Sequence, residues 1–445
     1  MVLNLPPEVF FILTTLEEKG FEAYIVGGCV RDFLLGFTPT DYDFCTNALP
    51  EQVKAAFISK DKITVVDNGA KFGTISVFID KKGYEITTFR SEGVYLDSRH
   101  PERVEFVDDL AIDLKRRDFT INAMAYNPQK SLIDLFGGQN DLRDKILQCV
   151  GDSNIRFQED ALRILRALRF ASMYGLQIES LTVQAIFTHK ELLKNLSAER
   201  VFKELCKTLL GNNIRDILLE YAEIFFVFLP ELEAMKDFPQ NNKAHIFDVY
   251  RHTAETVYHA KADIIIRLTM LLHDIGKPQC HKREADFDHF PTHPKVSAEI
   301  AKNILTRLKA DSYTMKTVLI LIEIHNLKLF PEAIELKKRL RDLGPELLYQ
   351  LVEVQRADAK GKSDIAREKI LARLQAVTAV LDELMSQKAV YSLKDLAVTG
   401  EDLKALGMQS GKEIGQMLKD ILELVIEEKI ANDRDKILAM VKVHL

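Results

Sequence analysis

Two aspartates that follow a glycine-rich turn are the residues of this sequence best suited to chemistry. Gly27 and Gly28 come after a short β-branched and aromatic run, Ala23–Val26, which is typical of a buried strand. Asp41 and Asp43 lie two positions apart, so on a second strand both carboxylates would point to the same face. Such a pair needs a cation between its members, and ligands that are all oxygen favour Mg²⁺, the usual companion of triphosphates. A turn followed by two solvated aspartates is the simpler alternative, but the combined spacing favours a nucleotidyltransferase site.

Two segments offer hydrogen-bond donors to phosphate. At the first, Gly28 would let the backbone approach a bulky anion, and the helix expected after it would present free N–H groups. The second is a basic segment further along the chain. Arg116 and Arg117 offer charge-assisted hydrogen bonds to phosphate or to a neighbouring carboxylate. Asp118 suits the first turn of an apolar helix, and Asn122 is placed to hold a sugar hydroxyl. Taken alone, the segment is equally well explained as a capped helix with a solvated basic corner.

Charged residues recur every third position on a helix expected over residues 155–174. The series consists of Asp160, Arg163, Arg166 and Arg169. The intervening residues are Ala, Leu and Ile, so the helix should be largely buried, and an unpaired buried charge costs several kcal/mol. Glu159 and Asp160 can pair with some of the arginines, and the others are expected to face an anionic ligand. An aspartate one turn from an arginine can also read the edge of a base, although a salt-bridged helix explains the pattern too.

Composition limits the class of protein. The chain has 445 residues, with 47% hydrophobic and 28% charged residues, so several domains with ordinary globular cores are expected. The net charge of −6 gives no global basic footprint, so any RNA binding must use local basic strips. The five cysteines are scattered and form no CxxC, which favours reduced thiols. Without a signal peptide or a bilayer-length apolar stretch, the sequence predicts a cytoplasmic enzyme with no membrane contact.

The pattern along the chain changes from α/β to helical at about residue 150. Short strands are predicted over 23–26, 41–45, 74–79, 84–89 and 132–134. Helical patterns dominate afterwards, with a polar, proline-containing break near Phe238–Asn242 and glycine-joined helices after Tyr391. The predicted domains span residues 1–150, 151–215, 216–385 and 386–445.

Six ordered motifs resemble the class II tRNA nucleotidyltransferases, that is, the bacterial CCA-adding enzymes and their poly(A) polymerase relatives. The motifs are GGCVRDFLLG, DYDFCT, TTFRSEGVYLDSRHP, RRDFTINAMAY, LIDLFGGQNDL and EDALRILRALRF. The resemblance implies a polymerase-β-like α/β nucleotidyltransferase head (1–150), an all-α neck with a base-reading motif (151–215), a helical body (216–385) and a tail that holds tRNA (386–445). It implies template-independent addition of CCA to the 3′ end of tRNA from CTP and ATP, with release of pyrophosphate.

The resemblance also implies roles for single residues. Asp41 and Asp43 correspond to the catalytic Mg²⁺ ligands, and Glu85 is a candidate third carboxylate. The nucleotide-binding positions are Gly28, Arg31 and Arg117 for the triphosphate, and Asp160, Arg163, Arg166 and Arg169 for the base. The segment 90–101 resembles the flexible loop that is used to switch from CTP to ATP. Its full length favours complete CCA addition over addition of CC alone.

A second set of residues, in the helical part, resembles the HD phosphohydrolase pattern. The matching positions are His252, His273, Asp274 and Asp358, and His289, His293 and His325 occur nearby. Imidazole and carboxylate ligands together suit Mn²⁺, Ni²⁺, Fe or Zn²⁺ better than Mg²⁺. The resemblance leaves open an active phosphohydrolase site or a scaffold that retains the residues, and core histidines remain the simpler alternative.

Three functional alternatives remain at this point. The chain could add only CC or only A, or it could be a poly(A) polymerase. It could also be a metal-dependent phosphohydrolase whose head binds RNA, although the intact Asp41/Asp43 pair opposes this. A pure RNA-binding scaffold is opposed by the same pair. The sequence gives no oligomeric state.

Overall fold

The computed structural model describes residues 3–58, 60, 62–92, 104–284, 287–409 and 411–444. The chain divides into two units, Met1–Phe228 and Leu229–Leu445, which are described separately. The chain runs from a part with mixed helices and strands into helical segments, as the sequence predicted.

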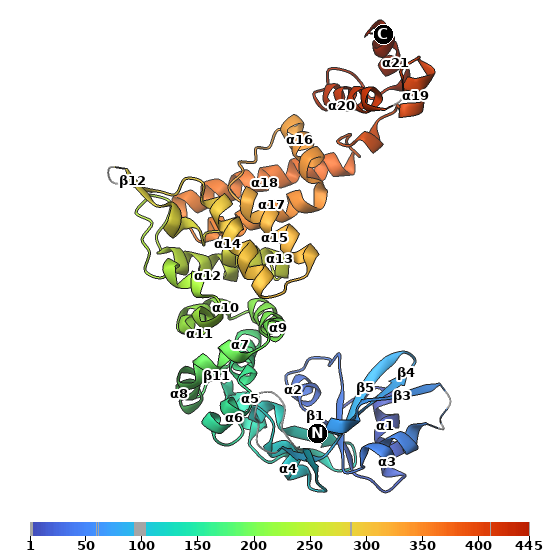
Figure 1. The fold of residues 1–445 in the computed structure, drawn as a ribbon, viewed down its shortest axis with the longest axis vertical. Helices are drawn as coiled ribbons and strands as arrows, with labels where there is room; N and C mark the ends of the chain where they lie inside the picture. The colour runs from blue at the N-terminus through green and yellow to red at the C-terminus, as the bar shows by residue number, and fades with distance from the viewer. Residues whose placement is uncertain are drawn as a thin grey trace. The chain divides into compact units, whose positions relative to one another are not determined.

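A seven-stranded mixed sheet forms the core of the first unit, in the order β3-β4-β5-β2-β1-β8-β9 (Figure 1). The strands are β1 (Ala23–Val26), β2 (Asp43–Thr46), β3 (Ile63–Gly69), β4 (Thr74–Ile79), β5 (Lys82–Thr88), β8 (Met124–Asn127) and β9 (Ser131–Asp134). β2 and β5 run parallel, and the other neighbouring pairs in this sheet run antiparallel.

The two faces of this sheet differ in what covers them. Ile25, Phe44 and Ile86 are neighbours in register on one face, and helices α1 (Pro7–Glu17) and α3 (Pro50–Phe57) pack against this side. The opposite face buries a cluster that includes Tyr24, Val26 and Cys45 under α4 (Leu110–Lys115). This second face continues to Asp43, beyond the cover of α4.

The remaining elements of the first unit are short strands and a run of helices. The strands are β6 (Arg90–Glu92), β7 (Val104–Phe106), β10 (Ile146–Leu147) and β11 (Gln177–Ile178). The helices are α2 (Gly28–Leu34), α5 (Gly138–Asp144), α6 (Ser153–Glu159), α7 (Leu162–Tyr174), α8 (Ser180–His189), α9 (Ala198–Leu209), α10 (Ile214–Glu220) and α11 (Ala222–Phe228). Helix α7 packs on α9, and this pair supports the arginine series.

Two local predictions were wrong, and a strand of seven residues was missed. The helix expected after Asp118 is a 3₁₀ turn, Thr120–Asn122, followed by β8, because this apolar segment fills a sheet position between β1 and β9. The helix expected over 155–174 is broken at Asp160, where φ is −143° and the side chain accepts the N–H of Leu162. Strand β3 was missed altogether.

The second unit is a bundle followed by a small helical tail (Figure 1). Its helices are α12 (Val249–His259), α13 (Ile264–Leu272), α14 (His293–Arg307), α15 (Ser312–Ile324), α16 (Ala333–Leu343), α17 (Pro345–Lys360), α18 (Asp364–Ser386), α19 (Gly400–Ala405), α20 (Lys412–Ile426) and α21 (Arg434–His444). Strands β12 (Lys282–Glu284) and β13 (Phe287–His289) form a hairpin. Helices α13 and α17 contact each other, and each also contacts α12 and α15, whereas α19–α21 have a core of their own.

None of the helices in the described ranges combines the length and the apolarity that crossing a bilayer requires.

Candidate functional site

Three carboxylates lie on the open part of the sheet in the first unit. Asp43 is in register with Glu85 on the parallel strand β5, so both side chains project from the same face. Asp41 precedes β2 rather than lying on it, but Tyr42 between the two aspartates is buried, whereas Asp41, Asp43 and Glu85 are exposed. The structure therefore brings Asp41 and Asp43 to one side, as predicted, and places Glu85 beside them.

The electrostatics of Asp43 show that charged groups surround it. Desolvation by the surrounding protein raises the pKa of the Asp43 carboxyl, the Arg117 guanidinium lowers it, and the Asp41 carboxylate raises it again, for a net increase. A bound cation would stabilise the charged form of Asp43 beside the Asp41 carboxylate. An all-oxygen donor set of this kind fits Mg²⁺.

Arg117 is held beside these carboxylates by a residue that the sequence analysis did not identify. Asp113, on α4, is fully buried and accepts hydrogen bonds from Arg116 and Arg117 at 2.8 and 3.1 Å. Burial would raise the pKa of Asp113, but the two arginines hold it below its ordinary value. The charge of Asp113 fixes both guanidinium groups under the sheet face. Its spacing of three and four residues from the two arginines is the sequence pattern that could have predicted these ion pairs.

Glycine is required at the start of α2 for two reasons. Gly27 has φ +77° and ψ −126°, a conformation that L side chains rarely adopt. A Cβ at this position would also lie 3.2 Å from Nη1 of Arg117. Gly28 begins the helix, as the anion-binding interpretation expected. The glycines thus bring backbone N–H groups and Arg117 close together.

Arg31, predicted to contact triphosphate, is buried in a network of its own. Its guanidinium donates to Asn122 at 2.5 Å, to Asp32 at 2.8 Å and to the hydroxyl of Tyr174 at 2.8 Å. It also stacks over the ring of Phe170, 5.0 Å from the centroid. In this structure Arg31 joins α2 to α7, and Asn122 serves this junction rather than a sugar.

Each of the arginines in the neck series has a carboxylate partner within the first unit. Arg163 pairs with Glu159 and also donates to the carbonyl of Arg116 at 3.0 Å. Arg166 donates to Asp118 at 2.7 Å, and Arg169 pairs with buried Glu204 at 3.2 Å. These arginines therefore do not need an external anion to balance their charge, contrary to the expectation from the sequence.

Asp160 pairs with a residue outside the series. Its carboxylate accepts from Arg200, on α9, at 2.8 Å, and from the N–H of Leu162 at 3.0 Å. Arg166 is the most exposed of the three arginines, with a third of its side chain open to solvent. Asp160 and Arg163 border the break between α6 and α7, so their polar ends are fixed by contacts rather than by a continuous helix.

The CTP-to-ATP loop predicted at 90–101 falls mostly on residues 93–103, outside the described residues.

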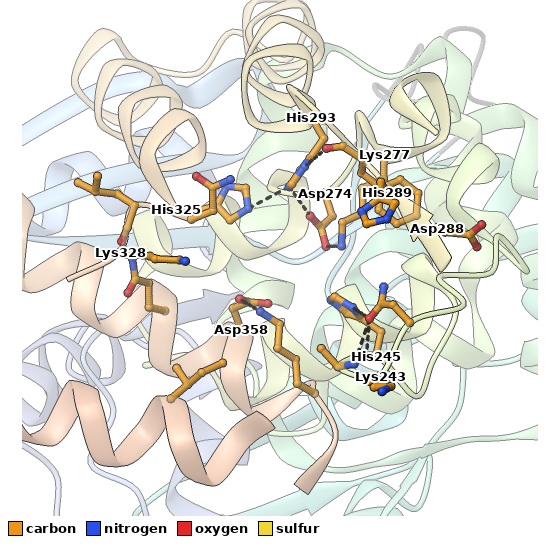
Figure 2. Close-up of a pocket in the computed structure, with 18 of the residues that line it drawn as sticks. Lys243, His245, Asp274, Lys277, Asp288, His289, His293, His325, Lys328 and Asp358 are labelled. Atoms are coloured by element: carbon orange, nitrogen blue, oxygen red, sulfur yellow. Dashed lines mark hydrogen bonds and ion pairs between the residues drawn. The ribbon is translucent and has the colours of Figure 1, made fainter. Parts of the chain in front are cut away.

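A second cluster lies in the second unit, where the ends of several helices meet (Figure 2). Nε2 of His252 lies 3.1 Å from Oδ1 of Asp358, and Nε2 of His273 lies 3.1 Å from Oδ2 of Asp274. The four residues of the predicted HD-type set are thus brought together. Two histidines that were not in the predicted set adjoin them: Nε2 of His293 lies 3.4 Å from Oδ1 of Asp274 and 3.3 Å from Nε2 of His325.

Burial favours the neutral form of three histidines in this second cluster, His252, His293 and His325. Burial lowers the pKa of His252 and of His293, and it lowers the pKa of His325 to about 3. Neutral imidazole is the form that binds metal ions. Oδ2 of Asp274 is buried and lies 2.6 Å from the ammonium of Lys277, and Nε2 of His273 is buried without a hydrogen-bond partner among the residues that the structure describes.

Comparisons with known proteins agree with this architecture. Residues 23–148 match the Poly A polymerase head domain, residues 175–236 match the RNA and SrmB-binding site of polymerase A, and residues 279–441 match tRNA nucleotidyltransferase domain 2. The sheet, its exposed carboxylates and these matches define the chain as a nucleotidyltransferase of the polymerase-β type.

Full-length relatives narrow this class. The CCA-adding enzyme of Lactobacillus helveticus is 33% identical over 97% of this chain and 96% of its own length. That of Enterococcus faecalis is 32% identical over 97% and 94%. This chain belongs to the family of CCA-adding enzymes, the tRNA nucleotidyltransferases.

Solved structures show the same fold over the whole chain. The Bacillus stearothermophilus CCA-adding enzyme in complex with CTP is 27% identical, with a TM-score of 0.70 and coverage of 99% of this chain and 98% of that one. The Thermotoga maritima CCA-adding enzyme complexed with tRNA has the same fold at 21% identity and a TM-score of 0.58, with coverage of 99% and 96%.

Proposed function

We propose that this chain adds C, C and A in turn to the 3′ end of tRNA, using CTP and ATP, without a nucleic acid template and with release of pyrophosphate. The observation that carries the proposal is the exposed pair Asp41 and Asp43, with Glu85 in register beside it, on the open face of a polymerase-β-like sheet. The full-length relatives support the same activity for the chain as a whole. The cytoplasm, where five free cysteines stay reduced, is the proposed location.

Different residues of the head would bind the metal ion and the triphosphate. Asp41 and Asp43 would hold Mg²⁺, with Glu85 as a third oxygen donor. When bound, Mg²⁺ lowers the pKa of the attacking 3′-hydroxyl and neutralises charge on the leaving pyrophosphate. Gly28 and Arg117 bind the triphosphate, because the α2 N-terminus and a fixed guanidinium both favour anions. Arg31 supports this site through its bonds to Asp32 and Asn122.

The base is read by residues at the junction between α6 and α7. Asp160 offers an acceptor and Arg163 a donor fork, and their ion pairs with Arg200 and Glu159 fix both orientations. Arg166 and Arg169 extend this surface. Side chains held in this way can form one set of hydrogen bonds with the edge of cytosine and a different set with the edge of adenine. No template strand is needed for this recognition.

Two further expectations are part of the proposal. The four-domain scheme assigns tRNA binding to the neck, body and tail, where Gly400 and Gly411 lie at helix starts. His252, His273, Asp274 and Asp358 would bind one transition-metal ion, which the mixed nitrogen and oxygen donor set favours over Mg²⁺.

The test is extension of a tRNA that lacks its CCA end, with Mg²⁺ and with CTP and ATP singly and together. We expect three added nucleotides that end in A. Asp41→Asn should lower the rate by about 10³-fold or more, because it removes an anionic metal ligand. Asp80→Asn, at an exposed turn of the same sheet, is the matched control and should leave the rate unchanged.

Other products would replace the proposal. Growth by C alone or by A alone would identify a partial adder, and a long A tail would identify a poly(A) polymerase. No extension by a folded protein would eliminate the head as a catalyst.

A further inference from the structure

Helix α16 of the bundle and helix α20 of the tail meet through side chains of opposite charge. Three cations of α16, here called the basic strip, are Lys337, Lys338 and Arg341. Three carboxylates at and just after the C-terminal end of α20, here called the acidic face, are Glu423, Glu427 and Glu428. Lys337 donates a hydrogen bond to Glu428 at 2.9 Å. Lys338 donates to Glu427 at 2.7 Å and lies 3.3 Å from Glu423, which also accepts from Arg341.

Each helix presents one sign of charge at this contact. The basic strip occupies positions i, i+1 and i+4 of α16, so its side chains share one side of the helix. Between residues 420 and 428 the chain carries four carboxylates and no lysine or arginine. Hydrogen bonds from Lys338 and Lys429 lower the pKa of Glu427 to about 2, so this carboxylate is charged at neutral pH.

The apolar residues of the two helices belong to different cores. Leu336 and Leu340 of α16 are buried, and this helix packs on α17 and α18. Ile421 and Leu422 of α20 belong to the tail cluster, whose described members all lie between residues 390 and 441. In the described part of the chain, ion pairs rather than a shared apolar core therefore connect α16 to α20.

These ion pairs can exchange for others because they are open to solvent. The side chains of Lys338 and Glu423 are 29% and 39% exposed, and that of Glu428 is 61% exposed. Ion pairs at this exposure stabilise a contact only weakly and are screened by salt. The tail is joined to the bundle by residues 387–392, between α18 and a 3₁₀ turn at Leu393–Asp395, so a rotation in this short segment would separate the two helices.

The carboxylates of the acidic face occupy the basic strip as phosphate groups would. Both kinds of oxygen accept charge-assisted hydrogen bonds from lysine and arginine. The first and last cations of the strip are four residues apart, which is about 6 Å along a helix and allows them to reach successive phosphates of one strand. A nucleic acid also releases condensed counterions when lysine and arginine bind it. It can therefore compete with three weakly held carboxylates.

We infer that the basic strip is an RNA-binding surface that the acidic face of the same chain masks, and that RNA phosphates displace the acidic face and release the tail from α16. The inference rests on the proposed function, which supplies tRNA as the polyanion. The strip and its mask belong to the second unit, so they are independent of the catalytic residues of the head.

The first test uses a carbodiimide, which joins a lysine to a glutamate that is in contact with it. In the free full-length chain we expect a cross-link between Lys338 and Glu427, detected by mass spectrometry of the digested protein. A saturating amount of tRNA that lacks its CCA end should lower the yield of this cross-link by about threefold or more, because the phosphates replace Glu427. Lys130 and Glu22, an exposed pair in the head at 2.6 Å, are the matched control and should keep their yield.

The second test compares variants that remove opposite sides of the contact. Glu423→Gln/Glu427→Gln removes the mask and keeps the strip, so tRNA should bind about threefold or more tightly in a filter-binding assay. Lys338→Gln/Arg341→Gln removes two cations of the strip, so tRNA should bind more weakly. The slope of log affinity against log salt concentration should also become shallower by about 1–2.

A matched control separates unmasking from a general change of charge. Glu401→Gln/Glu413→Gln makes the same change of charge at exposed positions elsewhere in the tail, and it should bind tRNA as the unchanged chain does. Circular dichroism checks that each variant is folded.

The remaining outcomes would overturn the inference. Weaker tRNA binding in both sets of contact variants would show that the ion pairs only support the structure. A Lys338–Glu427 cross-link that is absent from the free chain, or that persists in a complex whose tRNA is still extended, would overturn the masking and keep the proposed function. A folded chain that neither binds nor extends tRNA would overturn both.

Discussion

Asp118 is a single residue that organises the polar contacts between the head sheet and the neck helix α7. It is buried, and it accepts hydrogen bonds from the N–H of Phe119 at 2.8 Å, from Asn122 at 3.0 Å and from Arg166 at 2.7 Å. Burial alone would raise the pKa of Asp118, but the Arg166 guanidinium and the Asn122 amide lower it to about 2. The charged form is therefore strongly preferred in the folded protein.

This preference makes stability depend on pH. The folded pKa of Asp118, about 2, lies below the ordinary value of 3.8. Its stabilising contribution of about 2 kcal/mol is thus fully present above about pH 4 and is lost as the pH falls towards 2. Asp118→Asn keeps an acceptor but removes the charge, so its deficit in unfolding free energy should shrink over the same window. Urea unfolding followed by circular dichroism at pH 5, 3.5 and 2.5 checks this, and a deficit that stays constant would contradict it.

For single residues, the sequence predicted candidate site residues better than it predicted the residues with which they form ion pairs. Asp41, Asp43 and Gly28 could be proposed from the sequence because their spacing within one short segment is typical of the chemistry. The local pairing of Arg163 with Glu159 was anticipated, but the distant partners could not be: Glu204 lies 35 residues from Arg169, and Arg200 lies 40 from Asp160. His293 and His325 were noticed but left out of the HD-type set, because only the folded helix ends bring them to Asp274.

Among the elements, α2 depends most strongly on one backbone conformation. Gly27→Ala would place a side chain at φ +77° and a methyl group 3.2 Å from Arg117. We expect a loss of about 1–3 kcal/mol of stability and a fall of tenfold or more in the rate of nucleotide addition, because Arg117 must move. Gly20→Ala is the matched control: its φ is +84° and no atom of the described residues lies within 4 Å of its Cβ, so it should lose stability but keep its rate. Equal rates for both variants in single-nucleotide addition would contradict the expected role of Arg117.

Element prediction failed where tertiary structure overrode local pattern. The segment that forms β8 is apolar and reads equally well as a helix, but it completes the sheet between β1 and β9. Strands β1 and β4 were predicted with the bounds that the structure has, because short β-branched runs between turn residues are less ambiguous. The break at Asp160 was hidden by an unbroken helical pattern on both sides.

For the whole molecule, the proposals assign separate chemistry to each of the two units. If the second unit binds ions only when folded, added metal should stabilise that unit alone. In the Asp41→Asn/Asp43→Asn protein, Mn²⁺ at about 100 times its dissociation constant should add about 2.7 kcal/mol to the unfolding free energy of the second unit. Differential scanning calorimetry measures this as an upward shift of one transition. Asp274→Asn should abolish the shift, and a shift that persists in this variant would contradict the assignment.

The contacts between head and neck limit how the family can be recombined. Arg163 donates to the main-chain carbonyl of Arg116, Arg166 to Asp118, and Arg31 to Tyr174. A chimera that exchanges heads between two relatives at residue 150 would separate each of these pairs. The junction that preserves them lies after α9, so the head and the base-reading helices form one cassette for protein engineering.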